Sequence, residues 1–179
     1  MRLSVPIRLR WSDIDAYAHV NNAAMLGLLE EVRIQAFWTV PTGSAATSLR
    51  DASEPARLGP ADSADSGGEQ GPAVLDGRPG AETLSLIAHQ EVEYLRPIPY
   101  GRAPLDCEVW IARLGGASLD VNYEVYSPKG DEPRVLTTRA ASTLVLVDAA
   151  TQKPRRISGA ERAAWSPYLE DPVAFTARR

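Results

Sequence analysis

The polar stretch SDIDAYAHVNN, residues 12–22, gathers side chains that could act on a carbonyl group. Asp13, Asp15 and His19 precede a long apolar segment, and Asn21 and Asn22 stand at its start. A carboxylate is ionised at neutral pH, so it can attack a carbonyl carbon or draw a proton from water. The first N–H groups of a helix have no partner inside the helix and can receive the oxyanion that such an attack creates. The pattern therefore indicates acyl chemistry at a helix start.

A helix must follow this stretch to supply those N–H groups. Asn21 or Asn22 is a good N-cap, because its side chain can accept from a backbone N–H one turn into the helix. Apolar residues then recur at helical spacing almost all round, at Met25, Leu26, Leu28, Leu29, Val32, Ile34, Ala36, Phe37 and Trp38. Such a wide apolar surface predicts a helix that other structure wraps.

Alternating apolar residues predict five strands around this helix. One strand precedes the polar stretch, at 5–11, and four follow, near 86–95, 105–111, 119–125 and 135–147. Short turns between the last four predict antiparallel neighbours. One apolar helix beside one antiparallel sheet is an α+β arrangement. Because such a sheet leaves its edges open, we expect the chain to self-associate.

Composition predicts a single domain over residues 1–158 with an insertion at about 40–82. The insertion is rich in Gly, Pro, Ser and Ala and has no sustained period, which is typical of a flexible loop or a lid. Residues 159–179 form a C-terminal helix and tail. Ser158 is the predicted cap of that helix, and Glu161 stands at capping-box spacing from it.

Charge and apolar runs exclude several classes of protein. The net charge of −4 argues against a dedicated nucleic-acid binder. The N-terminus lacks the apolar run of a secretory signal, and no stretch approaches the ~20 apolar residues that cross a bilayer. We therefore expect a cytoplasmic protein that binds neither nucleic acid nor membrane. Cys107, the one cysteine, is predicted to be a small core residue.

Three phrases resemble a known family when they are taken in order. They are RWSDIDAYAHVNN with the helix that contains EEVR, then HQEVEYLRPIPYG, then RAASTLVLVDAATQKPRRI. This series resembles the acyl-CoA thioesterases of the hotdog fold, in particular the 4-hydroxybenzoyl-CoA thioesterase-like subgroup, over residues 3–38 and 86–158. The resemblance implies a five-stranded antiparallel sheet wrapped round one long central helix. It also implies a homodimer or homotetramer with active sites at the subunit interface, and neither cofactor nor metal is expected.

The resemblance also implies roles for single residues. Asp15 is the expected nucleophile or general base on the thioester carbonyl, and the acyl-CoA substrate yields free acid and CoA. The backbone N–H groups of Val20, Asn21 and Asn22 are the expected oxyanion donors. His19 is expected to hydrogen-bond the loop or line the pocket, and Tyr17 and Met25 are candidates for the acyl pocket. Arginine suits the phosphates of CoA, which makes Arg96, Arg102 and Arg139 candidates to bind it.

Other interpretations of the same residues stay open. Asp13 fits a turn or cap as well as a second catalytic acid. Asp13, Asp15 and His19 could be drawn as a metal site, although their spacing lacks the context of known metal motifs. Ala18 replaces a frequent glycine, so a positive φ at this position would be strained.

Two alternative functions remain. A hotdog hydratase or dehydratase also acts on acyl thioesters with an Asp–His pair, but hydratases place a proline in a longer loop between the two. A non-catalytic acyl-thioester-binding protein is the other. The carrier, CoA or acyl carrier protein, is also open, and the negative net charge favours CoA because carrier proteins are acidic.

Overall fold

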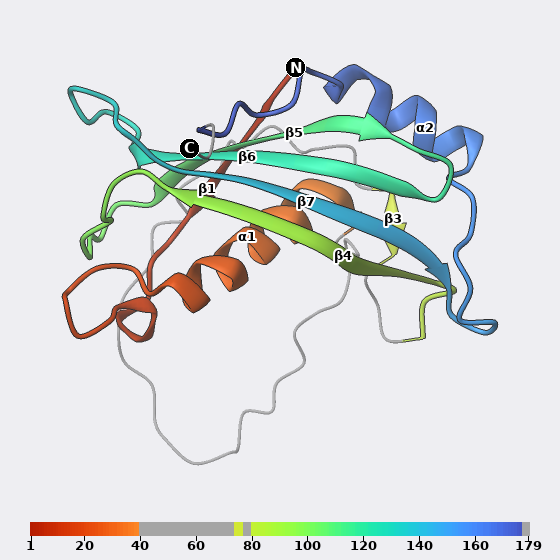
Figure 1. Ribbon diagram of the computed structural model, residues 1–179, viewed down its shortest axis with the longest axis horizontal. Coiled ribbons are helices and arrows are strands. Elements are labelled where there is room, and N and C mark those ends of the chain that lie inside the picture. The colour runs from red at the N-terminus through yellow and green to blue at the C-terminus, as the bar shows by residue number, and fades with distance from the viewer. Residues whose placement is uncertain (40–73, 77–79, 177–179) are drawn as a thin grey trace, which may run out of the picture.

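A computed structural model describes residues 1–39, 74–76 and 80–176 of the chain (Figure 1). Five strands form one antiparallel sheet in the order β1-β5-β6-β7-β4. They are β1 (Leu3–Ile7), β4 (Thr83–Tyr94), β5 (Leu105–Leu114), β6 (Ser118–Pro128) and β7 (Leu136–Asp148). The sheet curves around helix α1 (Asn22–Phe37), which lies across its concave face. The predicted α+β fold is confirmed.

The core lies between α1 and the concave face of the sheet. Met25, Leu29, Val32 and Ala36 are each 1% exposed and recur at the predicted helical spacing. They meet alternate residues of β5, β6 and β7 that point inward, including Val109, Ile111, Leu119, Val121, Leu144 and Leu146. Cys107 belongs to this core as predicted, and burial raises the pKa of its thiol far above the ordinary value. The thiol therefore stays protonated and inert.

The order of strands differs from the sequence prediction at one place. β4 does not pair with β5, the next strand along the chain, but with β7, across a bulge between Ile87 and His89. Pro97, Pro99 and Pro104 fall between β4 and β5, and proline cannot donate to the ladder that a hairpin there would need. The segment 95–104 therefore crosses the end of the sheet instead of forming a hairpin.

The predicted insertion lies mostly outside the described residues, at 40–73 and 77–79. Inside it, β3 (Leu75–Asp76) pairs in parallel with β2 (Trp38–Thr39), which continues directly from α1. The sequence pattern did not predict this pairing, because two residues are too few to show a period. Leu75 is buried in the core, so this part of the insertion packs against the domain.

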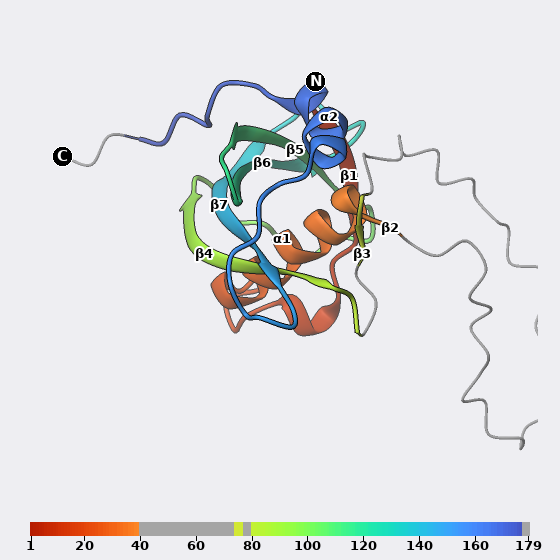
Figure 2. The same ribbon diagram turned by 90° about the vertical axis from the view of Figure 1, so that its right-hand side faces the viewer.

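The C-terminal residues close the outer side of the sheet. Helix α2 (Gly159–Trp165) has the predicted capping box: Ser158 Oγ accepts from the Glu161 N–H at 3.2 Å, and the Ser158 N–H donates to Glu161 Oε2 at 2.7 Å. A short 3₁₀ turn, η2 (Ser166–Tyr168), follows. Residues 170–176, which we name the C-terminal strap, then cross the convex face of the sheet away from α1 (Figure 2).

Candidate active site

The polar stretch folds into a tight loop whose centre is the side chain of Asp15. After a 3₁₀ turn, η1 (Trp11–Asp13), the Asp15 N–H donates to the carbonyl of His19 at 2.8 Å. Asp15 Oδ1 in turn accepts from the N–H groups of Tyr17, at 2.8 Å, and His19, at 3.2 Å. Within the described residues, Oδ2 has no hydrogen-bond partner. The loop therefore fixes one carboxylate oxygen and leaves the other available for chemistry.

Ala18 adopts the positive φ that the sequence analysis marked as costly. Its φ is +63°, and its N–H donates to the carbonyl of Asp15 at 3.1 Å. A residue with a Cβ costs roughly 1–2 kcal/mol in this left-handed region. The turn that holds Asp15 is therefore strained at one position.

Replacing Ala18 by glycine should relieve this strain. We expect Ala18→Gly to raise the free energy of unfolding by about 1 kcal/mol, because glycine takes positive φ without a steric penalty. Urea unfolding followed by circular dichroism measures the change. Ala117→Gly, at a residue where no positive φ is recorded, is the matched control and should destabilise. An equal loss of stability in both variants would contradict the strain at Ala18.

The start of α1 lies directly after this loop, and Asn21 caps it as predicted. Asn21 Oδ1 accepts from the Ala23 N–H at 2.8 Å. The structure corrects part of the predicted donor set, since the Val20 N–H donates to Ile98 O at 2.9 Å and the Asn21 N–H donates to Asp13 O at 2.8 Å. The Asn22 N–H, in the first position of the helix, meets no acceptor in the described part of the chain. Of the three predicted donors, Asn22 is the one whose N–H stays available.

Asp13 is a structural residue of the loop. Its side chain is 3% exposed, and its carboxylate accepts from the Arg10 N–H at 2.7 Å and from Arg10 Nη2 at 3.0 Å. Burial alone would raise the pKa of Asp13, but the hydrogen bonds from Arg10 outweigh it and hold that pKa below its usual range. These contacts agree with the turn-and-cap interpretation rather than with a second catalytic acid.

The other predicted residues of the loop and pocket are placed unequally. His19 is half-buried beside Asp15, and a β-bridge joins it to Pro99. Tyr17 is 81% exposed at the tip of the loop, so a single chain gives it nothing to line. Met25 is part of the closed core, so it does not line an open pocket within one chain. Its helical spacing already allowed this outcome.

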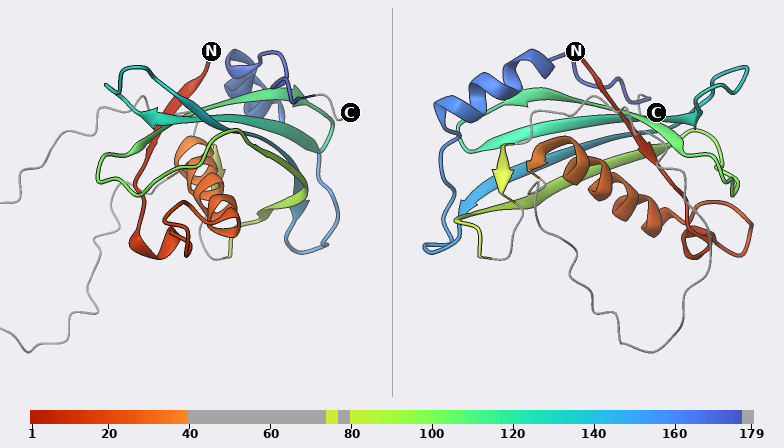
Figure 3. Two further views of the ribbon diagram at one scale, coloured as in Figure 1. Left: turned by 60° about the vertical axis from the view of Figure 1, so that its left-hand side comes forward. Right: turned by 180° about the vertical axis from the view of Figure 1, so that it is seen from behind.

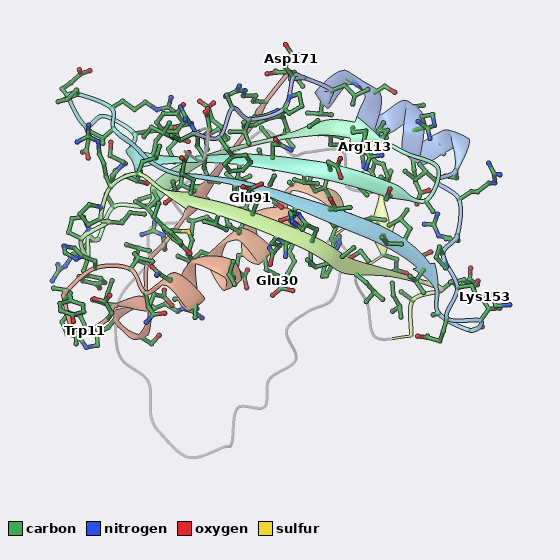
Figure 4. All side chains as sticks on the ribbon, in the orientation of Figure 1. Trp11, Glu30, Glu91, Arg113, Lys153 and Asp171 are labelled. Carbon is green, nitrogen blue, oxygen red and sulfur yellow. The ribbon has the colours of Figure 1, made fainter. Side chains whose placement is uncertain are left out.

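The predicted CoA-binding arginines separate into two groups. Arg96 and Arg102 are exposed on the segment 95–104, which packs against the Asp15 loop through the His19–Pro99 bridge and through the rings of Trp11 and Tyr100, 5.5 Å apart (Figure 4 labels Trp11). Both arginines thus lie at the end of the molecule that carries Asp15.

Arg139 is placed elsewhere. It lies on the convex face of β7 with Glu93 and Glu124 at 3.7 Å, and its Nη1 donates to Ala174 O of the C-terminal strap at 3.0 Å. The structure does not bring it together with Asp15, because successive residues of a strand point to opposite faces and residue 139 points away from α1.

Metal ligands do not gather in the described ranges. Within 1–39, 74–76 and 80–176, no three His, Cys, Asp or Glu side chains lie close enough together to hold an ion. Over the same residues, no helix is long and apolar enough to span a membrane.

Solved structures share this arrangement of sheet, helix and loop, which is the hotdog fold. The chain resembles a "predicted thioesterase" from Bacillus stearothermophilus with a TM-score of 0.64 and 18% identity, over 97% of this chain and 100% of that one. It resembles a thioesterase superfamily protein from Jannaschia sp. CCS1 with a TM-score of 0.62 and 16% identity, over 90% and 79%. A thioesterase from Thermus thermophilus, complexed with coenzyme A and Zn, gives 0.56 and 21%, over 90% and 95%. At these identities the likeness establishes the fold alone.

The family is established by sequence. The model of the Thioesterase-like superfamily matches residues 9–167, which include the Asp15 loop, α1 and the whole sheet after β1. The chain therefore belongs to the Thioesterase-like superfamily. No curated protein matches it in sequence.

Proposed function

We propose that this protein hydrolyses acyl-CoA thioesters, with Asp15 acting on the thioester carbonyl and the Asn22 N–H receiving the oxyanion. One observation carries the proposal: Asp15 has one oxygen fixed by its own loop and the other available, directly before a helix whose first N–H is unpaired. Such preorganised donors are worth about 3–4 kcal/mol each to a transition state. That the Thermus relative was solved with coenzyme A supports CoA as the carrier.

Two chemical routes fit this geometry. In the first, Asp15 Oδ2 attacks the carbonyl carbon, the C–S bond breaks, and CoA leaves as a thiolate that takes a proton from water. Water then hydrolyses the acyl–aspartyl anhydride. In the second, Asp15 takes a proton from a water molecule as that water attacks the same carbon. Both routes consume one water and yield the free acid and CoA.

A second copy of the chain is expected to complete the site. β4 is an edge strand, and its Leu84, Leu86 and Ile87 are 36%, 48% and 41% exposed. Unpaired strand edges with apolar side chains favour pairing with another strand. We infer that two chains join through β4, and that the partner covers the exposed loop around Tyr17.

A direct assay separates the candidate functions. Acyl-CoAs of short, medium, long and aromatic type are offered with a thiol-reactive dye, and crotonyl-CoA is followed for hydration. We expect release of free thiol from at least one class and no hydration. Hydration without thiol release would favour the hydratase. Tight binding of acyl-CoA without any turnover would favour the non-catalytic binder.

A further inference from the structure

One flank of α1 runs beside the inner face of β4. Asn22, Leu26, Glu30 and Arg33 recur at intervals of four, four and three residues, which places them on one side of the helix. At the first end of this flank, Tyr94 Oη of β4 donates to the carbonyl of Asn22 at 3.0 Å. Figure 3 shows α1 lying in the hollow of the sheet with β4 along its side. We name the space between this flank and β4 the α1–β4 groove.

The groove is apolar where it begins and polar where it ends. Leu26 and Tyr94, near Asn22, are 40% and 44% exposed. At the far end lies a cavity of about 50 Å³, which two charged residues of the flank, Glu30 and Arg33, line together with Ser85 and apolar residues. Glu30 projects from the middle of the helix (Figure 4). An acyl chain that enters beside Asn22 would therefore meet apolar surface first and charged groups last.

Arg33 is a buried cation with a neutral partner. It is only 6% exposed, and its Nη1 donates to Tyr123 Oη at 3.3 Å. Burial raises the pKa of Tyr123 to about 12, so this phenol is uncharged at neutral pH. Within the described residues, no carboxylate lies at ion-pair distance from Arg33. Since buried charges are normally paired, the guanidinium retains donor capacity toward the cavity that it lines.

The surroundings of Arg33 are themselves polar and ordered. Gln90 Nε2 of β4 donates to Ser142 Oγ of β7 at 3.1 Å, and Ser142 is almost fully buried beside Tyr123. This polar cluster sits between helix and sheet, where an apolar core would be cheaper. None of its members is needed for the attack on the thioester.

The charges in the cavity favour one kind of ligand group. Arg33 offers N–H donors and Glu30 offers carboxylate acceptors in the same small space. A hydroxyl group can accept from the first and donate to the second. A carboxylate would gain Arg33 but would meet the like charge of Glu30, and a methyl group would leave both without a partner.

We propose that Arg33 and Glu30 read the distal end of the acyl group and select chains that carry a hydroxyl there. This inference rests on the proposed thioesterase activity, with the reacting carbonyl at the Asn22 N–H. From Asn22 to Arg33 the helix rises about 16 Å, and the arginine side chain reaches back toward the helix start. The substrate is therefore an ω-hydroxyacyl-CoA of medium chain length.

The experiment compares matched substrates on matched variants. Plain, ω-hydroxy and ω-carboxy acyl-CoAs of hexanoyl, octanoyl and decanoyl length are assayed for thiol release. Wild type should favour the ω-hydroxy form by about tenfold or more in kcat/KM in at least one length set. In Arg33→Met this ratio should fall to about one, and in Glu30→Gln the ω-carboxy form should gain relative to wild type. Glu31→Gln, exposed on the other flank, should keep the wild-type ratio.

Two outcomes overturn the inference: a wild type with no ω-hydroxy preference at any length, or a folded Arg33→Met that keeps the preference. Replacing a buried cation by an apolar residue of similar size often leaves stability intact. If Arg33→Met does not fold, Leu26→Trp tests the same path, because it fills the groove and should abolish the preference. Calorimetric binding of the same CoA esters to Asp15→Asn tests selection without hydrolysis, so failure of this inference is distinguishable from failure of the proposed function.

Discussion

Asp15→Asn should lower kcat/KM for thiol release by about 10³-fold or more while leaving the fold intact. A positioned base contributes roughly 10²–10⁴-fold and an attacking nucleophile more, and an amide can serve as neither. The loop should survive, because asparagine retains an oxygen that can accept from the Tyr17 and His19 N–H groups, as Asp15 Oδ1 does. The variant therefore removes the available oxygen's chemistry and keeps its position.

Asp13→Asn is the matched control, since it makes the same change two residues earlier. It weakens the ion pair with Arg10 inside a buried setting, so it should cost stability and spare most of the activity of the folded fraction. Thiol release and thermal melting of both variants are measured together. Equal activity in wild type and Asp15→Asn would refute the role of Asp15, and full loss in Asp13→Asn without loss of stability would move the role to Asp13.

Local rules predicted much of this site because much of it is local. The Asn21 cap, the strain at Ala18 and the placement of Asp15 beside a helix start depend on residues within one or two turns of each other. The engaged N–H groups of Val20 and Asn21 were not predictable in the same way. Their acceptors are Ile98 O, from a segment far along the chain, and Asp13 O, which the turn brings back. Which backbone donors remain available was thus decided by tertiary contacts.

The same division applies to the fold. Alternation of apolar residues located every strand of the main sheet, because each has one face on the core. It could not pair β4 with β7, since the period of a strand carries no information about its neighbour. The C-terminal strap was likewise hidden. It has no period of its own, and its order comes from hydrogen bonds to side chains on three different strands, Trp110, Asn122 and Glu93.

The strap supports a second prediction with a large effect, on stability rather than on chemistry. Trp110 lies on the convex face of β5, yet it is 1% exposed, because the strap covers it and accepts from its Nε1 at Asp171 O, 2.9 Å away (Figure 4 labels Asp171). Val173 N–H also satisfies the buried Asn122 Oδ1 at 2.8 Å. Deleting residues 171–179 would expose the tryptophan and leave that amide oxygen to water.

We expect this deletion to lower the free energy of unfolding by about 2–3 kcal/mol. Exposing part of a large aromatic side chain and losing several hydrogen bonds each cost on the order of 1–2 kcal/mol, and the regained freedom of the strap offsets part of that cost. Urea unfolding gives the loss, and a red shift of tryptophan emission that Trp110→Phe abolishes assigns it to this residue. Thiol release at room temperature should stay within about twofold of wild type, because the strap lies on the face opposite α1 and Asp15. An unchanged unfolding midpoint would mean that the strap adds nothing to stability, and a loss of activity without unfolding would mean that the convex face contributes to the site.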